Sequence, residues 1–235
     1  DSIISGNGIV REGVDTLRAG WDPDPIESET LPLSQLLELQ KNYRTSSIRL
    51  MNISTSEGVS MLENCPNKPL ASVSWWHLIS DNSNLNLSEI GWRVVPSLGT
   101  PKDREALIKG LLQKTLNAVA VNSIGLDDAE IKGPPEQRLP GLTGYHLVLP
   151  CLWNELINKS GCSIETLWNA LSFGPSRMLH SKEESLAIGS RRWLIFDPNE
   201  KWLQKRIPRR SNIAANEPFE GKEITGKIVE CGLNY

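Results

Sequence analysis

The sequence predicts an α/β body built on a parallel sheet, followed by a β-rich C-terminal segment. Short, continuous apolar runs alternate with amphipathic helices, and strands of that kind are typical of a parallel sheet that is covered on both faces. From about Lys182 the pattern changes to strands and turns, as in "RRWLIFDP" and "KEITGKIVECG". The four strands predicted for the body are residues 47–53, 70–76, 91–95 and 116–122.

The helices follow from the spacing of apolar residues and from polar residues that can cap a first turn. Leu33, Leu36 and Leu37 share one helical face in "LPLSQLLELQKN". Ser54 or Thr55 can cap the helix of "TSEGVSMLENC". Three further helices are expected at residues 103–114, 145–158 and 163–172. Two segments rich in glycine, proline and polar residues are predicted to be loops, the second of a length that often borders an active site: residues 1–28 and 123–143.

The composition excludes several classes of protein. With 235 residues, 39% of them apolar and 23% charged, the chain is not disordered throughout. A formal net charge of −3 offers no electrostatic reason to expect nucleic-acid or membrane binding. The apolar runs are far shorter than the ~20 residues that span a bilayer, and the opening residues lack a signal-peptide pattern. We therefore expect a cytoplasmic protein with four reduced, buried cysteines: Cys65, Cys151, Cys162 and Cys231.

Candidate catalytic residues are few when the sequence is taken residue by residue. The three histidines are His77, His146 and His180, and no pair has the spacing of metal ligands. Neither a G-x-S-x-G hydrolase turn nor a G-x-G-x-x-G dinucleotide loop occurs between a strand and a helix. Taken alone, the residues predict no specific active site.

An ordered series of motifs nevertheless resembles one family. "LMNIST" is similar to the H-x-S-T strand end of dihydroorotases and related cyclic amidohydrolases, and "SVSWWHL" to their P-H-H-L segment. "VVPSLGTPKDREAL" resembles their N-P-P-L-R segment, and "LNAVAVNSIG" their strand that ends in D-H-A-P. "LPGLTGYHLVLPCLW" and the C-terminal motifs continue the series in the same order. The residues of these motifs are most similar to the divergent dihydroorotase-like branch found in cyanobacteria.

This resemblance implies a fold. It implies the second half of an amidohydrolase-type (β/α)8 barrel, with the last four βα units in residues 1–181, and a β-rich segment of a small β-sandwich in residues 182–235. The family's first strand, with its H-x-H metal pair, would then lie before Asp1. An open half-barrel leaves unpaired strand edges, so we expect the isolated chain to be oligomeric.

The resemblance also places functional positions, and the residues there depart from the family. Asn52, Trp76 and Asn122 occupy positions at which the family binds metal, and Asn122 stands for the catalytic Asp. His77, Pro140 and Gly141 fall at substrate-binding positions. The family would imply zinc, but an amide cannot take up and return a proton and an indole has no lone pair for a metal, so we expect none. Asn52, His77 and Asn122 are expected to share the barrel mouth.

Three hypotheses about function follow from the resemblance. The first is a non-catalytic dihydroorotase-like chain of pyrimidine metabolism that associates with aspartate transcarbamoylase. The second is a fragment of an active dihydroorotase or cyclic amidase, which interconverts dihydroorotate and carbamoyl aspartate and needs ligands from the missing N-terminal half. The third is a module that binds a small ring compound.

Overall fold

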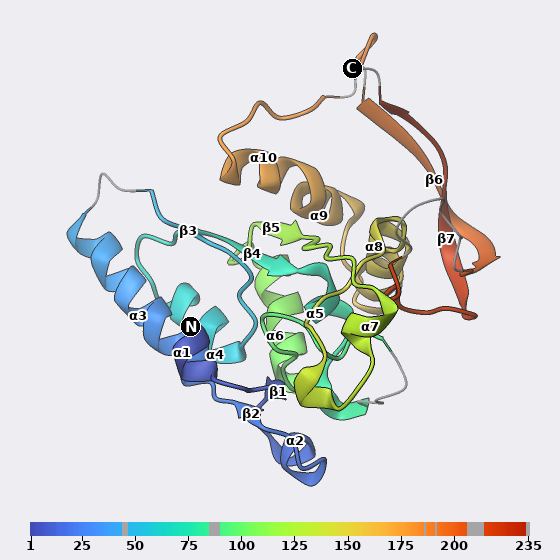
Figure 1. Ribbon diagram of the computed structural model, residues 1–235. Helices are drawn as coiled ribbons and strands as arrows, with labels where there is room; N and C mark the ends of the chain where they lie inside the picture. The colour runs from blue at the N-terminus through green and yellow to red at the C-terminus, as the bar shows by residue number, and fades with distance from the viewer. Residues whose placement is uncertain (44–46, 85–89, 186, 191, 206–213, 234–235) are drawn as a thin grey trace.

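The computed structural model describes residues 1–43, 47–84, 90–185, 187–190, 192–205 and 214–233 (Figure 1). At its centre is a parallel sheet of three strands in the order β3-β4-β5, formed by Arg49–Leu50, Leu70–Ser74 and Ala118–Ala120. Leu50 pairs with Ala71, and Val73 pairs with Val119. The parallel sheet is therefore confirmed, with three of the four predicted strands.

The predicted strand at residues 91–95 is wrong. This segment is irregular, although Trp92 and Val94 within it are buried. Its Arg93 carbonyl accepts a hydrogen bond from the Gly141 N–H, which lies in the long loop after β5. β4 pairs directly with β5, so the segment has no place between them. Pro96 also lacks the N–H that a strand ladder requires at that point.

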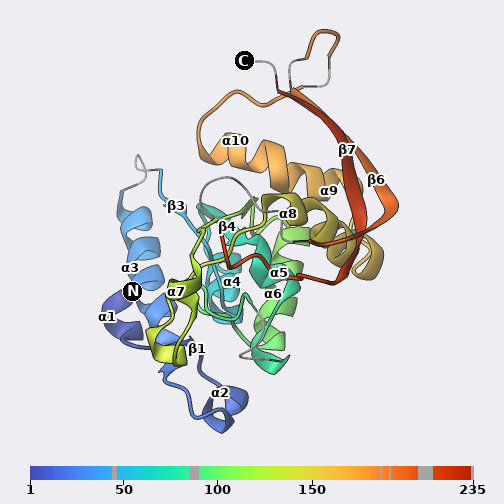
Figure 2. The ribbon, with the colours of Figure 1, turned by 45° about the vertical axis from the view of Figure 1, so that its right-hand side comes forward.

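Helices lie on both sides of the sheet (Figures 1 and 2). α4 (Ser56–Glu63) and α6 (Pro101–Leu112) lie on one side, whereas α9 (Ile164–Trp168) and α10 (Gly174–Met178) lie on the other. This arrangement explains why most residues of β4 and β5 are buried. Further helices of the body are α3 (Glu27–Asn42), α5 (Trp75–Ile79), η1 (Asn82–Asn84), α8 (Tyr145–Leu152), η3 (Trp153–Lys159) and η4 (Asn169–Phe173).

All five helices predicted from the sequence are present. The two C-terminal ones continue into π-helical turns, η3 after α8 and η4 after α9. Pro150 lies inside α8 and cannot donate a backbone hydrogen bond there. Within the described residues, no helix is both long enough and apolar enough to cross a bilayer.

One carboxylate joins the first turns of two helices. Thr55 caps α4 by accepting from the Gly58 N–H, and Thr100 and Asp103 form a reciprocal capping box at the start of α6. The second carboxylate oxygen of Asp103 accepts from the Ser56 N–H at 2.8 Å. Asp103 is buried and therefore holds the N-termini of α4 and α6 together.

Two regions that the sequence predicted as loops contain short regular elements. The N-terminal 28 residues form two small helices and a pair of parallel strands, α1 (Ser2–Ser5), β1 (Val10–Arg11), α2 (Val14–Arg18) and β2 (Pro23–Asp24). The long loop after β5 contains α7 (Asp128–Ile131) and η2 (Pro135–Gln137). The buried Asn216 clamps this loop, accepting from the Leu126 N–H and donating to the Ile124 carbonyl.

The C-terminal segment is a long antiparallel hairpin of β6 (Arg192–Leu203) and β7 (Glu223–Leu233). It curves over α8 (Figure 2). At Gly226, β7 comes close to Pro150 of α8. Gly226 has φ +95°, and a Cβ there would lie 2.7 Å from the Phe196 ring and 3.5 Å from the Pro150 Cα. The two described strands make one β layer, so the β-sandwich and the division at residue 182 remain predictions.

The four cysteines are free thiols, but they are not all buried. Cys65 and Cys162 are buried, Cys151 is half-buried, and Cys231 is exposed because it lies on the outer hairpin. The prediction of burial is therefore wrong for Cys231. Burial raises the pKa of Cys151 to about 12, so this thiol stays protonated at neutral pH.

We predict that removing the Asp103 carboxylate destabilises the fold more than removing either hydroxyl cap. Asp103→Ala should lower the free energy of unfolding by about 2–3 kcal/mol because buried N–H groups of two helices lose their acceptor, and Thr100→Ala by about 1 kcal/mol. Urea unfolding measures both. Asp127→Ala is the matched control, because Asp127 forms the same capping box on the exposed helix α7. Equal losses at Asp103 and Asp127 would contradict the shared role.

Candidate functional site

Two of the predicted site residues meet at the carboxyl edge of the sheet. Asn52 follows β3 and Asn122 follows β5, and the Asn122 Nδ2 donates to the Asn52 Oδ1 at 2.8 Å. Both residues have positive φ, 60° for Asn52 and 45° for Asn122, which asparagine tolerates better than most residues. The structure thus joins two side chains that are 70 residues apart, as their places at parallel strand ends predicted.

Trp76 is a packed core residue. It lies in α5, directly after β4, and its indole N–H donates to the Gly91 carbonyl. Its ring centroid lies 5.3 Å from that of Trp75 and 5.5 Å from that of Phe219. A Cβ on Gly91 would lie 2.4 Å from the Trp76 ring, so this contact requires glycine at position 91. Trp76 therefore packs the core beside the sheet.

His77 does not join the asparagine pair, contrary to the prediction that the three share one mouth. It is 2% exposed, and its Nε2 lies 3.2 Å from the Ser97 carbonyl oxygen. Because α5 begins right after β4, the ring turns inward toward the 93–98 segment. Burial lowers the pKa of His77 to about 4, so the ring is neutral at physiological pH.

Pro140 and Gly141 lie in different surroundings. Pro140 lines a cavity of about 610 Å³ together with Asn52. Gly141 instead lines a smaller recess with Trp92 and Arg138, and a Cβ on it would lie 3.1 Å from Ile124 and Leu126. Their assignment to substrate binding stays a prediction.

The 610 Å³ cavity borders the predicted site at Asn52. It lies between α3, the end of β3, the 93–97 segment and the N-terminal residues. Its lining includes six charged residues that the sequence analysis did not single out as candidates: Asp1, Arg11, Asp24, Glu29, Arg49 and Arg93. Arg11 and Asp24 lie in a segment predicted to be a loop, whereas Arg49 and Arg93 lie in short apolar runs predicted to be strands, so no local signal identifies them as one group.

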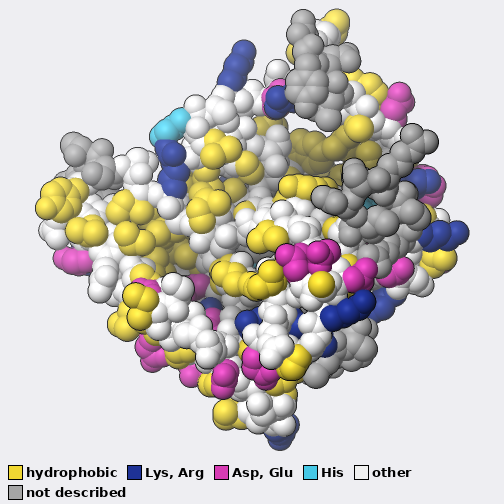
Figure 3. Space-filling model, viewed as in Figure 1, with side chains coloured by type: hydrophobic (Ala, Val, Ile, Leu, Met, Phe, Trp, Pro, Cys, Tyr) yellow, Lys and Arg dark blue, Asp and Glu magenta, His cyan; other side chains and the backbone are white. Residues whose placement is uncertain are grey.

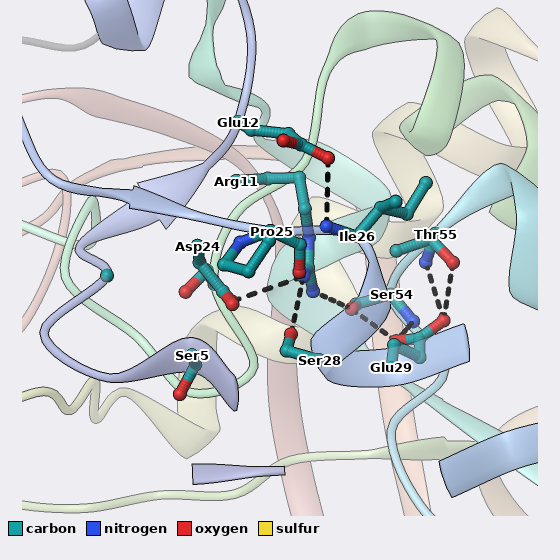
Figure 4. Close-up of polar contacts among 12 residues, drawn as sticks. Ser5, Arg11, Glu12, Asp24, Pro25, Ile26, Ser28, Glu29, Ser54 and Thr55 are labelled. Atoms are coloured by element: carbon teal, nitrogen blue, oxygen red, sulfur yellow. Dashed lines mark hydrogen bonds and ion pairs between the residues drawn. The ribbon is translucent and has the colours of Figure 1, made fainter. Parts of the chain in front are cut away.

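A buried network of charges starts from Arg11 (Figure 4). Its guanidinium is 3% exposed, lies 3.2 Å from the Asp24 carboxylate, and donates to the Ser28 and Ser54 hydroxyls at 2.8 and 3.0 Å. Glu29 continues the network, because its carboxylate accepts four hydrogen bonds from the backbone and hydroxyl groups of Ser54 and Thr55. Glu29 of α3 therefore holds Ser54 and Thr55, the Ser-Thr pair of "NIST", in place.

The residues at the family's metal positions do not fit a zinc ion. The two amides of Asn52 and Asn122 are neutral and bond to each other, and the indole of Trp76 offers no lone pair. Within the described parts of the chain, no group of three or more His, Cys, Asp or Glu side chains could hold a metal.

We predict that Arg11 is a major source of stability. Arg11→Leu should lower the free energy of unfolding by about 3–5 kcal/mol because it leaves the Asp24 carboxylate buried without its cation. Chemical denaturation measures the loss. The control is Arg18→Leu on α2, where the arginine is 77% exposed and the effect should be within about 0.5 kcal/mol. A loss at Arg11 no larger than at Arg18 would refute the prediction.

His77 should make stability depend on pH. The unfolded chain binds this proton below pH 6.5, whereas the folded chain binds it only near pH 4. The contribution of His77 to the free energy of unfolding is therefore fully present above pH 6.5. It decreases by on the order of 3 kcal/mol as the pH falls toward 4. Unfolding between pH 4 and 7 measures the slope, which should flatten in His77→Gln and persist in His180→Gln. An NMR titration of the folded protein that gives His77 a midpoint near pH 6.5 would contradict this prediction.

Comparisons with known proteins identify the chain's relatives. No protein-family model matches the sequence. It is 35% identical over 237 residues to a probable dihydroorotase-like protein of Synechocystis sp., covering 96% of this chain and 52% of that protein. It is 25% identical to the dihydroorotase of Thermoanaerobacter sp., covering 99% of this chain and 54% of the relative.

Solved structures show the same fold. The L-hydantoinase (dihydropyrimidinase) of Arthrobacter aurescens superposes with a TM-score of 0.77 at 18% identity, covering 89% of this chain and 48% of its own. The inactive dihydroorotase-like domain of the Chaetomium thermophilum CAD-like multifunctional protein superposes with a TM-score of 0.62 at 15% identity, covering 88% and 55%. This coverage agrees with a partial barrel. The chain belongs to the dihydroorotase-like amidohydrolases and spans about half the length of the relatives it matches.

Proposed function

We propose that this chain is a dihydroorotase-like protein that does not hydrolyse cyclic amides by itself. The observation that carries the proposal is the hydrogen bond between Asn122 and Asn52. The resemblance places a metal-binding, proton-accepting carboxylate at position 122 and a metal-binding histidine at position 52. Here neutral amide side chains occupy these two positions and form a hydrogen bond with each other.

The chemistry of ring hydrolysis explains the consequence. Water must be activated, and a nearby group must accept its proton and return it to the leaving nitrogen. The Asn122 amide has no accessible protonation equilibrium. The Asn122 Nδ2 donates to the Asn52 oxygen, and Trp76 fills the third position with a hydrocarbon surface. These side chains supply neither the base nor the ligands.

Two further points support the proposal. The Chaetomium thermophilum neighbour is described as an inactive dihydroorotase-like domain, so this fold occurs without activity in another protein. His77 is buried with its Nε2 3.2 Å from the Ser97 carbonyl oxygen and does not join Asn52 and Asn122, whose amides bond to each other.

The alternative is a fragment of an active dihydroorotase or cyclic amidase. The 610 Å³ cavity next to Asn52 favours it, because groups supplied from outside this chain could enter there. Binding of a small ring compound in the same cavity is the weaker third hypothesis. A cytoplasmic location and an association with aspartate transcarbamoylase stay predictions from the composition and the resemblance.

We predict that protein purified without chelators contains far less than one zinc per chain. It should not convert dihydroorotate above the uncatalysed rate, with or without added zinc. Elemental analysis and a dihydroorotate hydrolysis assay measure the two properties. Asn122→Asp should also be inactive, because Asn52 and Trp76 still lack metal-binding groups and residues of one catalytic unit act non-additively. Stoichiometric zinc that disappears in His77→Ala, or zinc-dependent turnover, would favour the active alternative.

A further inference from the structure

We propose that a second cavity, at the amino end of β5, binds a small zwitterionic molecule with an apolar side chain, of the chemical class of a free α-amino acid. This amino-end cavity has a volume of about 300 Å³. It lies between the last turn of α6, the turn that leads into β5, and the helices α9 and η4. Binding at this place does not rest on the proposed function.

The amino-end cavity lies at the opposite edge of the sheet from the asparagine pair. Asn117 lines it and directly precedes β5, whereas Asn122 follows the same strand. The Asn117 amide holds the backbone of this edge, because its Oδ1 accepts from the Ala71 N–H and its Nδ2 donates to the Lys114 carbonyl. In barrels built of βα units the catalytic groups stand at the carboxyl ends of the strands, so a ligand at the amino end is separate from that chemistry.

Two opposite charges line the amino-end cavity without pairing. Lys114 reaches it from the turn between α6 and β5, and Glu165 from α9. Within the described residues neither forms an ion pair, whereas Arg177 of the nearby α10 pairs with Glu183. Hydrogen bonds from its own backbone N–H and from the Ser163 hydroxyl lower the pKa of Glu165, so this carboxylate is ionised at neutral pH. One cation and one anion in the same cavity are complementary to a ligand that carries both charges.

The rest of the lining includes an apolar wall. Leu111, Leu116 and Ala170 belong to it and are each at most 2% exposed, and the half-buried Phe173 continues it. The wall differs from the exposed hydrophobic side chains that gather over α3 in Figure 3, because other parts of the chain already enclose it. Small-molecule sites typically combine an apolar lining with a few polar groups that fix the orientation of the ligand. The apolar wall therefore selects an amino acid with a hydrocarbon side chain.

Size and charge separate this ligand from the other occupants. A volume of about 300 Å³ is at the lower end of the range for ligand pockets, so the cavity fits a single small molecule and not a dinucleotide or a peptide. A dicarboxylate would bring a like charge against Glu165, and a diamine would do so against Lys114. A zwitterion avoids both repulsions and places its carboxylate at Lys114 and its ammonium at Glu165.

The test is a titration of the full chain with L-leucine, followed by two-dimensional amide NMR spectroscopy. Saturable shifts are expected at residues 111–117 and 164–173. Lys114→Gln and Glu165→Gln should each weaken binding by about three- to fivefold, as for partly exposed ionic contacts. Lys114→Arg keeps the charge and should lose less. Isocaproate, which lacks the ammonium group, and isoamylamine, which lacks the carboxylate, should each bind more weakly than leucine.

The matched controls are Glu105→Gln and Lys109→Gln. They change the same residue types at exposed positions of α6 outside the lining of the amino-end cavity, and both should bind leucine like the unmodified chain. Lys114 and Glu165 are exposed as well, so all four glutamine variants should fold, which circular dichroism checks.

Each contrary result overturns the inference. Absence of saturable shifts in the folded, unmodified chain excludes an amino acid as the ligand. Unchanged affinity in both Lys114→Gln and Glu165→Gln removes the role of the two charges. Binding of isocaproate or isoamylamine as tight as that of leucine assigns the cavity to a ligand with a single charge. Shifts confined to the surroundings of Asn52 and Asn122 place leucine at the other edge of the sheet. None of these readouts uses zinc or turnover, so they are independent of the proposed function.

Discussion

The buried guanidinium of Arg11 is the contact on which the arrangement of the N-terminal half depends. It pairs with Asp24 on the neighbouring strand and reaches the Ser28 hydroxyl on α3 and the Ser54 hydroxyl after β3. Removing either buried charge leaves the other unpaired, which is why such a pair locks a geometry even when its net energy is modest. Through Ser54, the same network reaches Glu29 and the Thr55 cap of α4.

From α4 the connection continues to α6 through a single carboxylate. Asp103 accepts from the Ser56 N–H and closes the capping box with Thr100. The strand ends that carry Asn52 and Asn122 therefore stand on a frame of buried polar contacts as well as on the apolar core. Ser54, two residues after Asn52, belongs to this frame, and Asn52 in turn accepts the hydrogen bond from Asn122.

The C-terminal segment contributes to the same region from the other end of the chain. Asn216 holds the loop after β5 through hydrogen bonds to residues 124 and 126, and Phe219 packs on Trp76. These contacts join segments about 90 and more residues apart in the sequence, so they shape the site without any local motif that announces them. Arg49 and Arg93 line the 610 Å³ cavity together with Asn52, so that cavity borders the asparagine pair.

The sequence by itself determined the parallel sheet, the principal helices, the family and the meeting of Asn52 with Asn122, because periodicity, capping residues and strand-end positions act locally or follow from parallel topology. It failed at residues 91–95, where an apolar run with Pro96 packs as an irregular segment because β4 pairs directly with β5. Only the tertiary structure decided the inward turn of His77, the Arg11 network and the cavity. Those features depend on which distant polar groups meet once desolvated, and no periodicity in a single segment encodes such pairing.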